Sequence, residues 1–135
     1  MEKKERYFYR RSDKLKSRDD IKILFAEGYR FSHFPFRVFC IKNDEAGSLK
    51  TAVAVSSKMF KRAVDRNRIK RLMREAYRLQ KNELSNHLLE LHKGMTLFIL
   101  YNGKELPEYK FVYEHIGKIL IRLLKFSNEN FKTLA

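Results

Sequence analysis

The segment of the sequence with the highest concentration of basic side chains lies between positions 58 and 78. Nine basic and two acidic residues fall in this run, for a net charge of +7. The basic residues are Lys58, Lys61, Arg62, Arg66, Arg68, Lys70, Arg71, Arg74 and Arg78. A guanidinium group binds phosphate through two parallel hydrogen bonds and stacks on bases, whereas an ammonium acts as a point charge. The preference for arginine therefore favours a nucleic acid as the partner.

Helical spacing would divide residues 63–79 into a cationic face and an apolar face. The cationic face would carry Arg66, Asn67, Lys70, Arg71, Arg74 and Arg78. The apolar face would carry Ile69, Leu72, Met73, Ala76, Tyr77 and Leu79, which we expect in the core. Like charges four residues apart destabilise an isolated helix, so a sequence that keeps them gains from a polyanion. An ordinary solvated helix face is the alternative interpretation.

The groups that a protein nuclease would need are not gathered in the sequence. The 16 acidic residues are scattered, and His33, His87, His92 and His115 lack metal-ligand spacing. We interpret these histidines as isolated surface residues, and we predict no catalytic residue and no metal site. The single cysteine, Cys40, excludes an internal disulfide and suits a reducing compartment.

The chain has 135 residues, a net charge of +14 and a pI of about 10.0. This length fits one domain, which we place at residues 18–127, after a basic arm (1–17) and before a tail (128–135). The longest apolar run, Met95 to Tyr101, is too short to span a bilayer. We therefore expect a cytoplasmic protein with no membrane contact and no stable protein partner.

The expected elements follow the order α-β-β-α-β-α, an α/β two-layer sandwich with a small mixed sheet. The helices are predicted at residues 19–28, 63–91 (with a break near 82–86) and from Pro107 to about Ser127. The strands are predicted at 34–42, 51–56 and 95–101, the last of them central. The first two strands should pair antiparallel across the turn at 43–48. Alternation would place Phe34, Phe36, Val38 and Cys40 toward the core, and Pro35, Arg37, Phe39 and Ile41 on the other side.

The stretch from Lys58 to Arg74 resembles the signature of the bacterial ribonuclease P protein component. The matching residues are Lys58, Ala63, Val64, Arg66, Asn67, Lys70, Arg71 and Arg74, and the family's RNR motif corresponds to Arg66-Asn67-Arg68. The flanking segments 15–25, 36–41 and 52–58 resemble the family's first helix and first two strands. The resemblance covers about residues 14–125.

The resemblance implies a small basic subunit of a ribonucleoprotein endonuclease. In that family the RNA subunit carries the active centre and removes the 5′ leader from precursor tRNA. The protein would bind ribonuclease P RNA and precursor tRNA and lower the need for Mg²⁺, which we expect to be held mainly by the RNA subunit and the substrate. The family's fold also implies a left-handed β-α-β crossover, where general chirality rules predict a right-handed one.

The resemblance also implies roles for individual residues. The residues that match the family's RNR helix and the lysine before it would face the catalytic RNA: Lys58, Arg66, Asn67, Arg68, Lys70, Arg71 and Arg74. We expect Lys61, Arg62 and Arg78 of the same basic run to join them. The leader would lie in a cleft between the first helix and the sheet, at positions matching Ile21, Phe25 and Phe39. Arg37 beside Phe39 would add a phosphate contact to a stacking contact. Simple core packing is an equally good interpretation of Phe25 and Phe39.

Two other functions compete with this one. A non-enzymatic RNA-binding module, such as a ribosomal or RNA-chaperone protein, could use the same basic helix. A free-standing protein nuclease would need the clustered catalytic groups that the sequence lacks.

Overall fold

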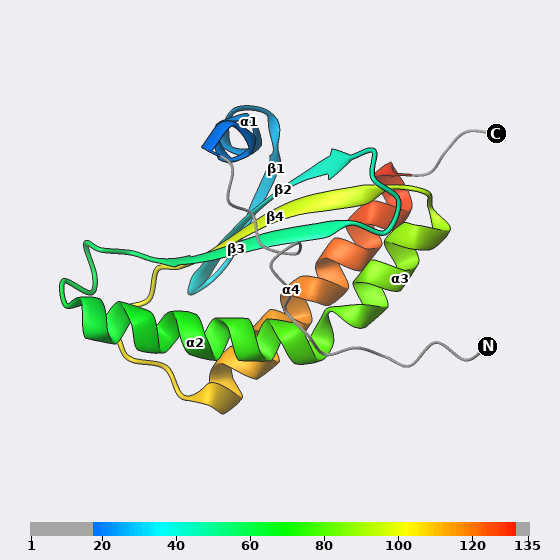
Figure 1. Ribbon diagram of the computed structural model, residues 1–135. Helices are drawn as coiled ribbons and strands as arrows, with labels where there is room; N and C mark the ends of the chain where they lie inside the picture. Colours follow the sequence, from blue (N-terminus) through cyan, green and yellow to red (C-terminus); the bar gives the residue numbers. More distant parts are fainter. Residues whose placement is uncertain (1–17, 132–135) are drawn as a thin grey trace.

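The computed structural model describes residues 18–131, so the predicted basic arm and the last four residues lie outside the described part. The elements are α1 (Arg18–Glu27), β1 (Tyr29–His33), β2 (Phe36–Asn43), β3 (Leu49–Val55), α2 (Ala63–Gln80), α3 (Asn82–Glu90), β4 (Gly94–Tyr101) and α4 (Tyr109–Asn130). Helix α1 lies on one side of the sheet, and α2, α3 and α4 lie on the other (Figure 1). The predicted α/β class and order of elements are confirmed, with β1 as an addition. The predicted helical break is present, but it lies at Lys81, and residues 82–86 belong to α3.

The four strands are ordered β1-β2-β4-β3. Strand β4 pairs antiparallel with β2 and parallel with β3, so it is central, as its continuous apolar run predicted. The predicted hairpin between β2 and β3 is wrong, because β4 lies between them. The turn at 43–48 is local, with the backbone N–H of Glu45 bonded to Asn43 Oδ1 (3.0 Å). Such a turn fixes neither which strands pair nor which strand enters between them.

Strand β1 is the element that the sequence did not predict. It pairs antiparallel with β2, from Tyr29 opposite Cys40 to His33 opposite Phe36. Phe34, predicted in the core, is 83% exposed, because it lies in the β1–β2 turn before a cis peptide bond to Pro35. Pro35 itself is buried. The alternation predicted for the strand holds from Phe36 onward.

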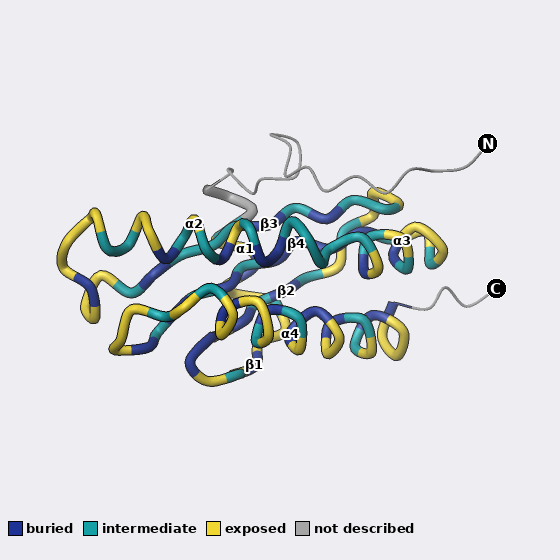
Figure 2. The backbone as a smooth tube through the Cα atoms, turned by 90° about the horizontal axis from the view of Figure 1, so that it is seen from below, coloured by how far each residue is buried: buried dark blue, intermediate teal, exposed yellow. Residues whose placement is uncertain are grey.

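The core lies between the sheet and the layer of α2, α3 and α4. Buried residues are found both on the strands and on these helices (Figure 2). The core contains Phe36, Val38 and Cys40 from β2, all fully buried. Burial raises the pKa of the Cys40 thiol to about 12, which makes it unreactive. On α2, four of the six predicted core residues are buried: Ile69, Met73, Ala76 and Tyr77.

The C-terminal helix continues past its predicted end at Ser127. It runs to Asn130, and Phe131 is buried against Phe126, with ring centroids 5.6 Å apart. The apolar contact of Phe131 explains the extra turn. No helix in residues 18–131 is long and apolar enough to cross a membrane.

Candidate nucleic-acid interface

The cation face of α2, defined as the nine basic residues of positions 58–78 with Asn67, lies on the loop before α2 and on the outer side of that helix. The residues that are solvent-exposed include Lys58, Lys61, Arg62, Asn67, Arg68, Arg71 and Arg74. The positive end of the helix dipole lies at the N-terminus of α2, near Arg62, and it adds to the field of these side chains. The arrangement favours an extended anion over a single small one.

Arg66, the first arginine of the RNR motif, is engaged within the protein. Its Nη1 donates hydrogen bonds to the carbonyl oxygens of Phe60 (2.7 Å) and Lys61 (2.8 Å). The Phe60 ring is buried beside Tyr101, with ring centroids 6.1 Å apart. Arg66 therefore fastens the loop that carries Lys58, Lys61 and Arg62 to the first turn of α2.

Arg78, at the other end of the face, is held by a carboxylate. Its Nε donates to Glu75 Oε2 (3.1 Å) and its Nη2 to Glu75 Oε1 (2.6 Å). The hydrogen bond from Arg78 lowers the pKa of Glu75. Between these two ends, Lys70, Arg71 and Arg74 have no side-chain hydrogen bond or ion pair to other residues in the described part of the chain. These three cations are available to a phosphate.

Two polar contacts fix α2 in the fold. The buried hydroxyl of Thr51 on β3 donates to Tyr77 Oη at 2.7 Å, which ties the inner face of α2 to the sheet. The amide of Gln80 donates to the carbonyl oxygens of Ala76 (3.0 Å) and of Tyr113 on α4 (2.9 Å). Because the inner face is fixed, the orientation of the outer cations is fixed with it.

The aromatic cluster, defined as Phe25, Phe39 and Phe98, lies between α1 and the sheet. The ring of Phe25 meets Phe39 and Phe98 edge-on, with centroids 4.9 Å and 5.1 Å apart, and Phe39 and Phe98 are 6.1 Å apart. Phe25 is 41% exposed and neither Phe39 nor Phe98 is fully buried, so the cluster is separate from the main core. Exposed aromatic rings on a sheet can stack on unpaired bases.

Sequence reasoning missed Phe98. It belongs to the apolar run that we predicted as the central strand, and it lies directly opposite Phe39 in the β2–β4 pairing. On its other side it lies opposite Ala52 of β3, whose small side chain offers little surface to cover the half-buried Phe98 ring. Alternation along β4 could have placed Phe98 on the outer face only if the pairing with β2 had been known.

The other two residues predicted for the leader site are close to this cluster. Arg37 is exposed on β2, on the same face as Phe39. Ile21 is half-buried, one helical turn before Phe25 on α1. The structure thus brings all four predicted residues of this site to the α1 side of the sheet.

The prediction of isolated histidines is wrong for two of the four. His33 Nε2 on β1 and His115 Nδ1 on α4 are 3.0 Å apart, within hydrogen-bonding distance. The two residues are 82 positions apart in the chain, so sequence spacing could not reveal the pair. Within residues 18–131, no three His, Cys, Asp or Glu residues come together as a candidate metal site.

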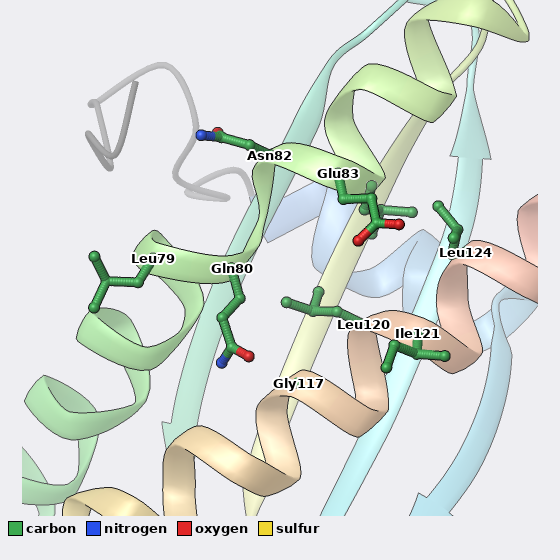
Figure 3. Close-up of a pocket in the computed structure, with 9 residues that line it drawn as sticks. Leu79, Gln80, Asn82, Glu83, Gly117, Leu120, Ile121 and Leu124 are labelled. Atoms are coloured by element: carbon green, nitrogen blue, oxygen red, sulfur yellow. The ribbon is translucent and has the colours of Figure 1, made fainter. Parts of the chain in front are cut away.

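A pocket of about 300 Å³ lies between the α2–α3 junction and α4 (Figure 3). Its lining consists of Leu79, Gln80, Asn82, Glu83, Leu84, Gly117, Leu120, Ile121 and Leu124. The absence of a side chain at Gly117 lets Gln80 approach α4 closely. The lining carries the carboxylate of Glu83 and no cation, so the pocket does not suit an RNA phosphate.

Comparisons with known proteins agree on one family. The sequence model described as Ribonuclease P matches residues 9–124. A ribonuclease P protein component from Porphyromonas gingivalis (strain ATCC 33277) is 40% identical over 115 residues, which cover 84% of this chain and 84% of that protein.

Solved structures give the same answer for the fold. The RNase P protein of Staphylococcus aureus aligns with a TM-score of 0.65 at 19% identity, over 85% of this chain and 97% of that one. The RNase P protein of Thermotoga maritima aligns with a TM-score of 0.61 at 26% identity, over 81% of this chain and 96% of that one.

Proposed function

Because the chain belongs to the ribonuclease P protein family, we propose that its α2 cation face binds the catalytic RNA and its aromatic cluster binds the 5′ leader of precursor tRNA. The protein is a subunit of the ribonuclease P holoenzyme, an endoribonuclease of tRNA maturation whose catalysis takes place on the RNA. Its partners are ribonuclease P RNA and precursor tRNA. The proposal therefore concerns which residues of this chain meet which RNA.

The observation that carries the proposal is the contrast between held and available cations on α2. Arg66 and Arg78 have partners within the protein, while Lys70, Arg71 and Arg74 between them are available. RNA binding would offset the mutual repulsion of these neighbouring cations and release counterions from the phosphates. The whole predicted set would contribute, either by direct contact or, for Arg66, by placing Lys58, Lys61 and Arg62.

For the leader site, the arrangement of rings supports single-stranded RNA. Phe25, Phe39 and Phe98 offer ring edges and partly open faces, and Arg37 lies on the same side of the sheet. An unpaired nucleotide could stack there while its phosphate meets the guanidinium. Holding the leader in this way would fix the precursor relative to the RNA active centre and would favour precursor over mature tRNA.

We further propose that Mg²⁺ is held mainly by the RNA subunit and the substrate, and that the protein acts in the cytoplasm, where its RNA partners are made. The scattered carboxylates of the described residues do not fit a protein-held Mg²⁺ site. The protein would lower the Mg²⁺ requirement indirectly, because the cations of α2 would neutralise RNA phosphates that Mg²⁺ otherwise neutralises. Titrating Mg²⁺ into the protein alone in a calorimeter should give no tight binding, and a tight site would contradict this.

A reconstitution assay tests the proposed function. The protein is mixed with a bacterial ribonuclease P RNA and precursor tRNA at low Mg²⁺, where the RNA alone cleaves poorly. We expect the protein to raise the cleavage rate and to bind precursor more tightly than mature tRNA. Failure to stimulate cleavage would contradict the role in leader removal, and cleavage by the protein without RNA would contradict the RNA-based site.

A further inference from the structure

A second surface with the chemistry of an RNA site lies on α4, beside strand β1. One face of α4 carries an aromatic ring, a histidine and two cations at positions i, i+4, i+7 and i+11: Phe111, His115, Lys118 and Arg122. Phe111, Lys118 and Arg122 are exposed and His115 is half-buried, and the exposed fraction of Phe111 is 38%. We call these four residues the α4 stripe.

The stripe faces the edge strand of the sheet. Alternate residues of β1 contact α4 in register: the ring of Tyr29 stacks on Phe126 (4.1 Å), Arg122 lies over the ring of Phe31 (4.0 Å), and His33 meets His115. Two of these three contacts involve residues of the stripe, and together the three fix α4 relative to β1. The side chains of the stripe are thus held at a defined distance from the sheet.

The charge along this surface is positive. The charges of Lys118 and Arg122, together with the neighbouring His115, help to lower the pKa of His33, although burial of the His33 ring is the larger cause. The acidic residue nearest to the stripe in sequence is Glu114, at its margin. Neither Glu114 nor any other carboxylate in the described part of the chain forms an ion pair with Lys118 or Arg122. The ring of Phe111 packs against His115, with centroids 4.2 Å apart, and is otherwise partly exposed. An electropositive surface with a partly exposed aromatic ring favours a phosphate chain with bases.

The α4 stripe is continuous with the proposed leader site. The opposite face of β1 carries Arg30, exposed and directly opposite Phe39 of the aromatic cluster. Only one strand, about 4.8 Å wide, separates Arg30 from the α4 side of β1. A single strand of RNA that leaves the cluster over Arg30 would reach Arg122 and Lys118 by crossing this edge.

We propose that the α4 stripe binds backbone phosphates of the 5′ leader upstream of the nucleotides held by the aromatic cluster. The proposal rests on the function proposed above, because it assumes that the leader occupies the cluster. Lys118 and Arg122 supply the phosphate contacts, and the exposed face of Phe111 supplies a base contact. The site then distinguishes leaders by their length.

Leader-length dependence tests the proposal. The reconstituted holoenzyme is assayed against precursor tRNAs whose leaders are lengthened one nucleotide at a time, with wild-type protein and with Lys118→Glu. Affinity for precursors with short leaders should be unchanged, and affinity for those with long leaders should fall roughly two- to fivefold. Lys110→Glu, on another face of the same helix, should show no such dependence on length.

Other outcomes identify what is wrong. An equal loss for every substrate, together with weaker binding of the RNA subunit, would place the catalytic RNA on the stripe and overturn the proposal. No loss at any length would also overturn it. Phe39→Ala is measured in the same series to separate the two proposals when Lys118→Glu gives one of these negative results. If Phe39→Ala still weakens binding of precursor tRNA selectively, only the proposal for the α4 stripe is overturned. If it does not, the proposed leader site is overturned as well.

Discussion

The cation face of α2 and the aromatic cluster over the sheet differ in how far each is organised before RNA binds. On the cation face, Arg66 and Arg78, the first and last basic residues of α2, are held by partners within the protein, while Lys70, Arg71 and Arg74 between them have none in the described part of the chain. The three rings of the cluster already pack on one another. Long-range charge suits a large, uniformly charged RNA, whereas contact packing suits a few unpaired bases. The difference predicts strongly salt-dependent binding at α2 and a nearly salt-independent contribution from the three rings of the cluster.

The largest effect is expected from removing three neighbouring cations of α2 together. In the variant Lys70→Ala, Arg71→Ala and Arg74→Ala, affinity for the RNA subunit should fall roughly a hundredfold at low salt. The slope of log affinity against log salt should flatten by about one for each phosphate that the variant no longer binds. Filter binding over a salt series measures both quantities. An unchanged slope would mean that this face does not meet the RNA.

A smaller effect, confined to one substrate, is expected at the cluster. Phe39→Ala should weaken binding of precursor tRNA by roughly 1–3 kcal/mol if the ring stacks on a leader base. Mature tRNA should bind as before, and the difference should persist at high salt. Equal loss for both substrates would assign Phe39 to structural packing. Thermal unfolding of the variant serves as the control for its stability.

A comparison of Arg66 with Arg74 tests whether Arg66 contacts RNA directly or only positions the cations of the loop before α2. Arg66→Ala removes two hydrogen bonds to the loop carbonyls and should speed hydrogen exchange of the loop amides before α2, while Arg74→Ala should not. We expect Arg66→Ala to cost about fivefold in RNA affinity. On a background lacking Lys58, Lys61 and Arg62, this cost should shrink, whereas that of Arg74→Ala should persist. Additive losses for both would make Arg66 a direct phosphate contact.

Glu75 offers the reverse change, a gain of binding. Glu75→Gln removes the carboxylate that holds Arg78 and leaves a neutral amide of the same shape. RNA affinity should rise about twofold, with a slope steeper by up to about one, because an acidic charge is removed and Arg78 is released from Glu75. Arg78→Ala alone should then cost less than Arg74→Ala. If the two arginine variants weaken RNA binding equally, the ion pair does not withhold Arg78 from RNA.

The cation face could be predicted from sequence because it lies within one helix, where spacing alone sorts residues onto faces. The aromatic cluster could be predicted only in part. Phe25 and Phe39 followed from local patterns and the family resemblance, but Phe98 depends on the β2–β4 pairing, which no local turn encodes. The same cause explains the wrong hairpin and the missed β1. The pair of His33 and His115 is the extreme case, because its two partners are far apart in the described chain.

The smallest expected effect is a dependence of stability on pH that arises at the contact between β1 and α4. Burial, His115, Lys118 and Arg122 lower the pKa of His33 from its usual 6.5. As pH falls below 6.5, the unfolded chain takes up a proton at this site more readily than the folded one, so this site contributes less stability in acid. Because His33 joins β1 to α4, acid should loosen the strand that carries Arg30 beside the aromatic cluster, and leave α2 in place.

His33→Gln should reduce the fall in melting temperature between about pH 7 and pH 5, and an unchanged fall would show that other groups set it. Over the same pH range, the preference of the wild type for precursor over mature tRNA should weaken, while the salt slope of RNA-subunit binding should not change. Such a result would show that protonation acts on the leader site and leaves the cation face of α2 unaffected.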